Sequence, residues 1–247
     1  MKRFLIALQF LTILPLNIKG KIEEKDFGRS LIYYPIVGLL IGLFLAGIAY
    51  ISAFLPPLVT SVLILVAWMV ITGGIHLDGF ADTCDGFYGN RPKEDILKIM
   101  RDSRIGTMGA AGVVMLLLIK FATLSSIRSE DLWKVLIITV VFARWSQVLV
   151  CSTSKYARDE GKAKYFIEYA KKSDMFIGAL FTLLLNWLLM GVKGVILFVI
   201  LLAVIFLFMQ YVKRKIGGMT GDTIGATNEI AEATALLFSL ILLNYKI

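Results

Sequence analysis

The residues best suited to chemistry in this chain are carboxylates in one short polar segment. Residues 73–109 read GGIHLDGFADTCDGFYGNRPKEDILKIMRDSRIGTMG and hold 6 of the 18 acidic residues. Asp78, Asp82 and Asp85 are spaced by four and then three residues, so a helix would place all three on one face. No Lys or Arg lies within 77–90 to offset them. Such a cluster repels itself and needs solvent, protons or a cation.

A divalent cation with oxygen ligands would stabilise the cluster, and Mg²⁺ suits it because Mg²⁺ binds one or two carboxylates together with substrate phosphates. The predicted chemistry is therefore phosphoryl transfer, in which a metal neutralises charge on the transferring group. The predicted metal ligands are Asp78, Asp82, Asp85 and Asp102. The first three and His76, the only histidine, are the candidate general bases. A hydrogen-bonded structural role is an equal alternative for His76.

Plain solvation is the structural alternative for these acids. Three features favour a ligand instead. Glycines through the segment let backbone approach a ligand closely, the cluster lies directly at the end of an apolar stretch, and idle charge in apolar surroundings is costly.

A short helix is predicted after the carboxylates, because Pro92 is followed by two acids. Beyond it, Arg101 and Arg104 are three residues apart and could grip phosphate oxygens from one face. Anchoring at the membrane surface, or ion pairing to Asp102, is an equally good interpretation of these arginines.

A second polar motif, GGMTGDTIGATNEIAE at 217–232, precedes the last apolar stretch. A glycine-rich turn that opens a helix favours an anion, through free N–H groups and the helix dipole. The motif lacks the Gly-Lys-Ser/Thr ending of a Walker A loop. Glu229 and Glu232 enter the apolar stretch, where acids are functional candidates; pairing with Arg144 or Lys120 is the structural alternative for Glu232. Predicted substrate-binding residues are Arg101, Arg104, Gly217, Gly218, Thr220, Asp222, Thr223, Asn228 and Arg158.

The elements that must position these residues are membrane helices. The 247 residues are 58% hydrophobic and 18% charged, whereas soluble domains carry about 25% charge. We predict an all-α, polytopic integral membrane helical bundle that forms a single domain over 1–247. Residues 4–16 are too short to span, so they are predicted to be interfacial or re-entrant. About seven transmembrane helices are expected at 31–55, 58–75, 107–126, 132–152, 175–190, 194–212 and 224–243. Only residues 191–193 separate the fifth from the sixth, so a tight hairpin is expected there. Gly38 and Gly42 form a small-xxx-small pair that predicts close helix packing, and Lys120, toward the outer end of its segment, is expected to extend to the membrane surface.

The basic residues predict the orientation of the bundle. With the N-terminus in the cytoplasm, cytoplasmic loops hold 20 of the 26 Lys and Arg residues and outside loops hold four, which follows the positive-inside rule. This placement also accounts for the net charge of +8 through lipid headgroups, so nucleic acid is not expected as a partner. The two cysteines, Cys84 and Cys151, are expected to be reduced.

Four motifs resemble segments of the cobalamin synthase family, in the same order: HLDGFADTCDGFYG, KIMRDSRIGTMG, ARWSQVLVCSTSKYARDEGKAKYF and GGMTGDTIGATNEIAEA. The segment ALQFLTILPL is similar to the family's N-terminus. The resemblance implies a multi-pass enzyme of the cell inner membrane that joins adenosylcobinamide-GDP to α-ribazole, or to its 5′-phosphate, with Mg²⁺. GMP would be released and adenosylcobalamin, or its 5′-phosphate, formed. Cys84 stands where the family pattern suggests a small residue such as alanine.

Three other functions compete with this interpretation. Asp82-x-x-Asp85-Gly86 is similar to the start of the CDP-alcohol phosphotransferase signature, although the remainder of that signature is missing. A cation-coupled transporter would also carry intramembrane acids, but its charges usually lie near mid-bilayer. A non-catalytic scaffold for corrinoid enzymes would tolerate loss of the aspartates. Membrane lipid, other corrinoid enzymes and further copies of the chain are candidate partners.

Overall fold

The structure, a computed structural model, describes residues 1–244 and is almost entirely helical over that range. One isolated bridge, between Tyr156 and Met219, is its only β-type pairing. The long helices are α3 (Tyr34–Ile51), α4 (Pro57–Thr72), α7 (Thr107–Ser126), α8 (Ser129–Thr153), α10 (Lys172–Met190), α11 (Val192–Ile216) and α12 (Gly221–Asn244). The shorter ones are α1 (Lys2–Leu11), α2 (Glu24–Ser30), the 3-10 turn η1 (Leu31–Tyr33), α5 (Ile75–Phe87), α6 (Lys93–Ile99) and α9 (Ala163–Glu168).

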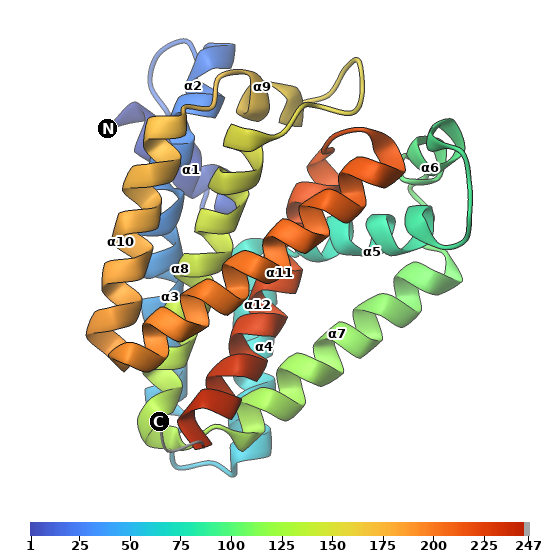
Figure 1. Cartoon of the computed structure of the whole chain (residues 1–247). Helices are drawn as coiled ribbons and strands as arrows, with labels where there is room; N and C mark the ends of the chain where they lie inside the picture. The colour runs from blue at the N-terminus through green and yellow to red at the C-terminus, as the bar shows by residue number, and fades with distance from the viewer. Residues whose placement is uncertain (245–247) are drawn as a thin grey trace.

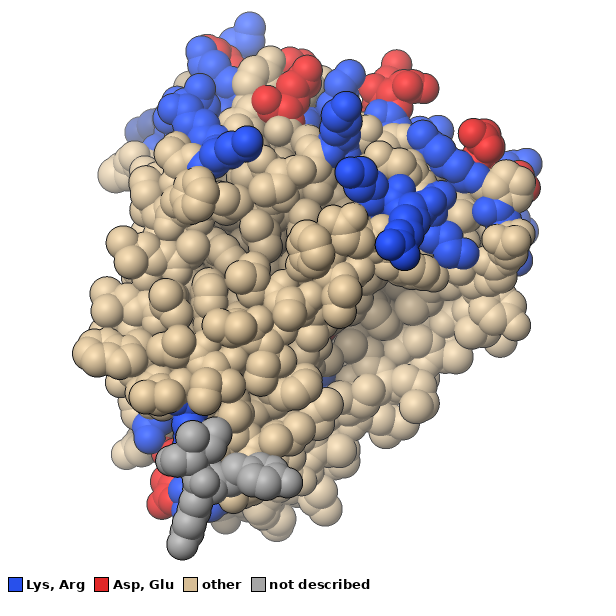
Figure 2. Space-filling view, in the orientation of Figure 1, with Lys and Arg blue, Asp and Glu red and all other residues tan. Residues whose placement is uncertain are grey.

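Each of the seven predicted membrane segments coincides with one of the long helices. Six runs, including α2 to α3 as a single run, are long and apolar enough to cross a membrane. The helix α4 qualifies only together with α5, from which it is bent by 92°. The helix α1 and the last turn of α12 lie at opposite ends of the bundle (Figure 1), as an odd number of crossings requires. Lys and Arg gather at the end that carries the N-terminus (Figure 2).

The break between α4 and α5 explains why the helix that carries the carboxylates does not continue along the direction of α4. Gly73 and Gly74 both adopt left-handed backbone, with φ of 62° and 66°, a conformation that glycine enters without the steric cost of a Cβ. The chain therefore turns sideways and starts a new helix. The segment that was expected to be a polar loop is thus helical over α5, and its three aspartates follow the helical spacing.

The helix α8 forms the centre of the bundle, and α3 packs closely along it. In an 18-residue apolar stretch of α8, 89% is buried inside the bundle. Gly38 and Gly42 make this contact close: a Cβ on Gly42 would lie 2.8 Å from the Cα atom of Ile137. The predicted packing role of this small-xxx-small pair is confirmed, since small residues let membrane helices approach each other.

Two predicted local features also agree with the structure. The tight hairpin between α10 and α11 turns at Gly191, which has a φ of 59°. The N-terminal helix α1 has ten residues, which gives it a length of about 15 Å, half the hydrocarbon thickness of about 30 Å. Lys2 and Arg3 at its start form ion pairs with Asp26 of α2, at 2.6 and 3.4 Å.

We expect Gly42→Ala to destabilise the protein by about 1–3 kcal/mol, because the added methyl group overpacks the α3–α8 contact. Gly47→Ala is the matched control on the same helix, where a Cβ would meet nothing within 4 Å; there the better helix propensity of alanine should leave stability unchanged or raise it. Unfolding of both variants in mixed detergent micelles measures the difference. Equal stability of the two variants would show that the close approach does not matter.

Candidate active site

The carboxylates of α5 meet the first turn of α12. A Cβ on Gly79 would lie 2.8 Å from the backbone oxygen of Asp222 and 2.9 Å from its Cα atom, so the two helix backbones touch. Gly79 directly follows Asp78, and Asp82 lies one turn further along α5. The carboxylate segment and the 217–232 motif are therefore in contact, although Asp82 and Asp222 are 140 residues apart in the sequence. Their predicted placement on the same side of the membrane requires this.

Three other carboxylates act on Asp82. It is half-buried, and it is repelled by Asp222, Asp78 and Asp85, while Arg158 is the cation that acts on it. Arg158 is itself paired with Asp222, with 2.8 Å between Nη2 and Oδ2. The excess of negative charge favours a cation near Asp78 and Asp82.

Asp85 has a different task in the structure. Its two carboxylate oxygens accept hydrogen bonds from the backbone N–H groups of Gly106 and Gly109, each at 2.7 Å. These groups belong to the free N-terminal end of α7, where a carboxylate is favourable. A Cβ on either glycine would collide with the Asp85 carboxylate. Asp85 therefore anchors α7 to α5.

Asp102 lies apart from the α5 carboxylates as well. It is exposed, and its carboxylate accepts hydrogen bonds from the Arg104 guanidinium at 2.8 and 3.1 Å. This partner lowers the pKa of Asp102 to about 2. Within residues 1–244 no three His, Cys, Asp or Glu residues are grouped closely enough to hold a metal ion. The predicted four-carboxylate ligand set is thus not assembled; the structure instead brings Asp222 to Asp78 and Asp82.

A cavity of about 370 Å³ opens beside these carboxylates and is called the bundle cavity here. Asp78, Asp222 and Arg158 are among the residues that line it, and its remaining wall is mainly apolar and aromatic. His76, a predicted general base, is buried in this wall on the first turn of α5. The size is within the range of small-molecule sites.

A second hollow, of about 390 Å³, lies on the other side of Arg158 and is called the basic hollow. Lys93, Lys98, Arg101 and Arg158 line it, with Glu94 and Asp159. Arg101, which was predicted to bind phosphate, thus lines a hollow with three other cationic side chains. Arg104, its predicted partner, does not line this hollow because Asp102 holds its guanidinium. The sequence analysis did not identify Lys93 and Lys98 as candidate phosphate-binding residues. Their position on the predicted helix after Pro92, close to Arg101, could have indicated them.

The glycine-rich turn before α12 is occupied by internal contacts. Thr220 and Thr223 are fully buried, and each accepts a hydrogen bond from the other's backbone N–H group, at 3.2 and 2.8 Å. Gly217 ends α11 with a φ of 80°, and Gly218 has no room for a Cβ against Lys155. In the structure these residues hold the start of α12, and their predicted phosphate binding stays a prediction.

The same turn fixes the position of Arg158. The backbone N–H of Met219 donates to the oxygen of Lys155 at 2.8 Å, and the N–H of Ala157 donates to the oxygen of Met219 at 2.9 Å. This pairing holds the loop before α9 against the start of α12. Burial raises the pKa of Tyr156 in this loop, and its ring lines the bundle cavity.

Comparison with known proteins connects this site to one family. Residues 3–240 match the family model described as cobalamin-5-phosphate synthase. The chain belongs to this family. An adenosylcobinamide-GDP ribazoletransferase of Geotalea daltonii is 38% identical over 238 residues, or 96% of each chain. The enzyme of the same name from Clostridium novyi is 38% identical over 248 residues, which are 100% of this chain and 98% of the relative.

A third relative of that name, from Caldanaerobacter subterraneus, is 36% identical over 246 residues, 98% of this chain and 99% of its own. No solved structure matches the chain. Membership of the cobalamin-5-phosphate synthase family favours the ribazoletransferase interpretation over the transporter and the lipid phosphotransferase.

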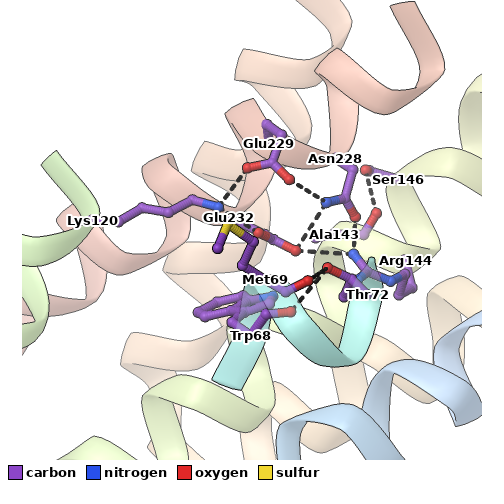
Figure 3. A network of polar contacts seen from close by, with 10 residues as sticks. All are labelled: Trp68, Met69, Thr72, Lys120, Ala143, Arg144, Ser146, Asn228, Glu229 and Glu232. Atoms are coloured by element: carbon purple, nitrogen blue, oxygen red, sulfur yellow. Dashed lines mark hydrogen bonds and ion pairs between the residues drawn. The ribbon is translucent and has the colours of Figure 1, made fainter. Parts of the chain in front are cut away.

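Below the site, in the interior of this family member, lies a network of buried charges (Figure 3). Lys120 of α7 pairs with Glu229 and Glu232 of α12 at 2.5 and 2.6 Å. Arg144 of α8 pairs with Glu232 at 2.9 Å, and Asn228 hydrogen-bonds both Arg144 and Glu232. We call these five residues the buried ion network; its two positive and two negative charges cancel.

The buried ion network decides two predictions. The expectation that Lys120 extends to the membrane surface is wrong, because its side chain is 5% exposed and its ammonium group lies 5.0 Å from the centre of the Trp68 ring. The structural pairing of Glu232 is confirmed with both Arg144 and Lys120. Asn228, predicted to bind substrate, is fully buried in this network and lies away from both cavities.

We expect Lys120→Met to cost about 3–5 kcal/mol of stability, because it leaves a buried carboxylate without its counter-ion. The double variant Lys120→Met/Glu229→Gln restores neutrality and should recover most of that loss. Detergent-titrated unfolding of the two single variants and the double variant measures the coupling between the two residues. Additive losses would exclude a shared charge balance.

Proposed function

We propose that this chain is an adenosylcobinamide-GDP ribazoletransferase of the cytoplasmic membrane. The observation that carries the proposal is the arrangement of two cavities around Arg158. The bundle cavity, largely apolar, suits a nucleoside such as α-ribazole or its 5′-phosphate. The basic hollow suits a diphosphate such as that of adenosylcobinamide-GDP, because guanidinium and ammonium groups bind phosphate oxygens. Arg158 lines both.

The carboxylates lie where the two substrates would meet. In the proposed reaction the ribose hydroxyl gives its proton to Asp82, and its oxygen bonds to the phosphorus nearer the cobinamide. The bond from that phosphorus to the bridging oxygen breaks, and GMP leaves with the electron pair. Arg158 and Arg101 hold the diphosphate and offset its charge. His76, in the wall of the bundle cavity, is the second candidate for the proton.

Mg²⁺ fits the donor set at this point. The carboxylates of Asp78 and Asp82 have no hydrogen-bond or ion-pair partner among the described residues, and Asp222 is adjacent. One or two carboxylates with substrate phosphates are the usual ligands of this ion in proteins. Asp78 and Asp82 would hold it together with the substrate phosphates, and it would neutralise charge on the transferring phosphoryl group when bound. Asp85 contributes by anchoring α7, and Asp102 by its pair with Arg104.

The competing functions have less support from the same geometry. The unpaired acids of α5 lie near one end of the bundle, and the deeper acids Glu229 and Glu232 are neutralised by Lys120 and Arg144. This buried network, within residues 1–244, therefore has no net charge to offer an ion path. The basic end of the molecule (Figure 2) would face the cytoplasm and anionic lipid. Association with other corrinoid enzymes, or between copies of the chain, stays a prediction.

The proposal is tested with purified protein in lipid, supplied with adenosylcobinamide-GDP and α-ribazole, with Mg²⁺ or with EDTA. We expect GMP and the corrinoid product in equal amounts, and only with Mg²⁺. Folded protein that releases no GMP with either form of ribazole would contradict the proposal.

Asp82→Asn should abolish turnover while the protein stays folded in the membrane, because the amide neither accepts the proton nor binds Mg²⁺ as a carboxylate does. The matched control is Asp95→Asn on α6, an exposed acid that lines neither cavity. The GMP-release assay compares both variants. Near-normal turnover by Asp82→Asn would remove this residue from the mechanism.

Arg101→Gln should raise KM for adenosylcobinamide-GDP about tenfold, through loss of a charged hydrogen bond to phosphate. KM for ribazole should not change. Arg104→Gln, three residues on, removes an arginine outside the basic hollow and should leave both KM values near those of the wild type. Equal effects of the two substitutions would indicate general surface attraction in place of a specific contact.

A further inference from the structure

A buried amide faces the bundle cavity without a hydrogen-bond partner. Gln147 of α8 is 1% exposed and lines the cavity. Its Nε2 atom is buried and has no partner within residues 1–244. A buried donor left unpaired costs free energy, so a ligand that accepts a hydrogen bond there would gain affinity and specificity together.

The wall around this amide is apolar and aromatic. Cys151 lies one turn further along the same face of α8, and Tyr34 and Phe166 contribute rings whose centroids are 6.2 Å apart at an interplanar angle of 61°. All three line the cavity. Apolar and aromatic walls with an unpaired buried donor among them suit an aromatic heterocycle that carries a lone pair in its ring plane.

Charged residues that line the same cavity set the direction of such a ligand. Asp78, Asp222 and Arg158 are among them, and a sugar hydroxyl would have to lie near them to reach the phosphorus. A nucleoside would therefore place its base among the aromatic rings and its ribose toward the carboxylates. A lipid acyl chain could fill the apolar part but would leave the Gln147 amide unpaired.

We propose that Gln147 selects the base of the nucleoside substrate by donating its Nε2–H to a ring nitrogen. The inference rests on the proposed function. The base of ribazole is a benzimidazole, in which one nitrogen carries the ribose and the other presents an in-plane lone pair. This second nitrogen is the acceptor. A site built around such a hydrogen bond rejects an analogue that lacks the acceptor, because the buried donor is then left unpaired.

The test compares α-ribazole with the corresponding indole riboside, in which a CH group replaces the acceptor nitrogen. With saturating adenosylcobinamide-GDP and Mg²⁺, the wild type in lipid should show a kcat/KM for ribazole about tenfold or more above that for the indole riboside. Gln147→Met should bring the ratio close to one by lowering kcat/KM for ribazole alone. Equilibrium dialysis of both nucleosides gives the same comparison without turnover.

Gln210→Met is the matched control, the same change on α11 at a residue outside the bundle cavity; it should keep the wild-type ratio. A Gln147→Met variant that loses activity toward both nucleosides equally would assign Gln147 a structural role and overturn the inference. If the Gln147→Met variant does not fold, the wild type alone tests the inference. Equal kcat/KM of the wild type for ribazole and the indole riboside would overturn the inference and leave the proposed function intact. A wild type that releases no GMP overturns the proposed function instead.

Discussion

Charge buried in an apolar bundle must be neutralised by other charge, and this requirement holds α12 in place. Glu229 and Glu232 on α12 bind Lys120 of α7 and Arg144 of α8, and the Lys120 ammonium also lies over Trp68 of α4. Four helices are thereby tied at one depth. Because α12 is one continuous helix from its first turn to this network, Asp222 at its N-terminal end is positioned by contacts roughly two to three turns further along.

The first turn of α12 then decides where the carboxylates of α5 can act. Gly73 and Gly74 break the membrane path and send α5 sideways, and Gly79 lets its backbone touch Asp222. The same contact places Arg158 between the carboxylates and the basic hollow, through the short pairing of its loop with Met219. The site is thus assembled from three segments, none of which could form it alone.

The two cavities give this assembly a division of tasks. The bundle cavity is largely apolar, with the unpaired Gln147 amide in its wall, and the basic hollow is lined by four cationic side chains. A nucleoside base and a diphosphate would therefore bind in different places. The two cavities meet at Arg158, which partly offsets the repulsion among Asp78, Asp82 and Asp222. A bound cation would relieve the rest of that repulsion and would attract the anionic phosphates of the substrate, so binding of the cation and of the substrate would be coupled at this point.

Much of the fold could be predicted from the sequence, because it depends on local properties. Apolar stretches of sufficient length predicted the seven segments, the distribution of Lys and Arg predicted the charged end, and Gly38 with Gly42 predicted a close helix pair. The spacing of Asp78 and Asp82 likewise placed them on one helix face. These properties follow from hydrocarbon thickness, helix period and side-chain size.

Only the tertiary structure decided the partners of each polar residue. Asp82 and Asp85 were predicted to lie on the same helix face, but only Asp85 accepts hydrogen bonds from the free N–H groups of α7. Lys120 lies near the end of its segment, where it could have reached the surface, yet Glu229, 109 residues away, holds it inside. The amide of Gln147 gave no signal until the helices around it enclosed a cavity. A hydrogen bond or ion pair depends on distances between segments, and the sequence by itself determines only the distances within one.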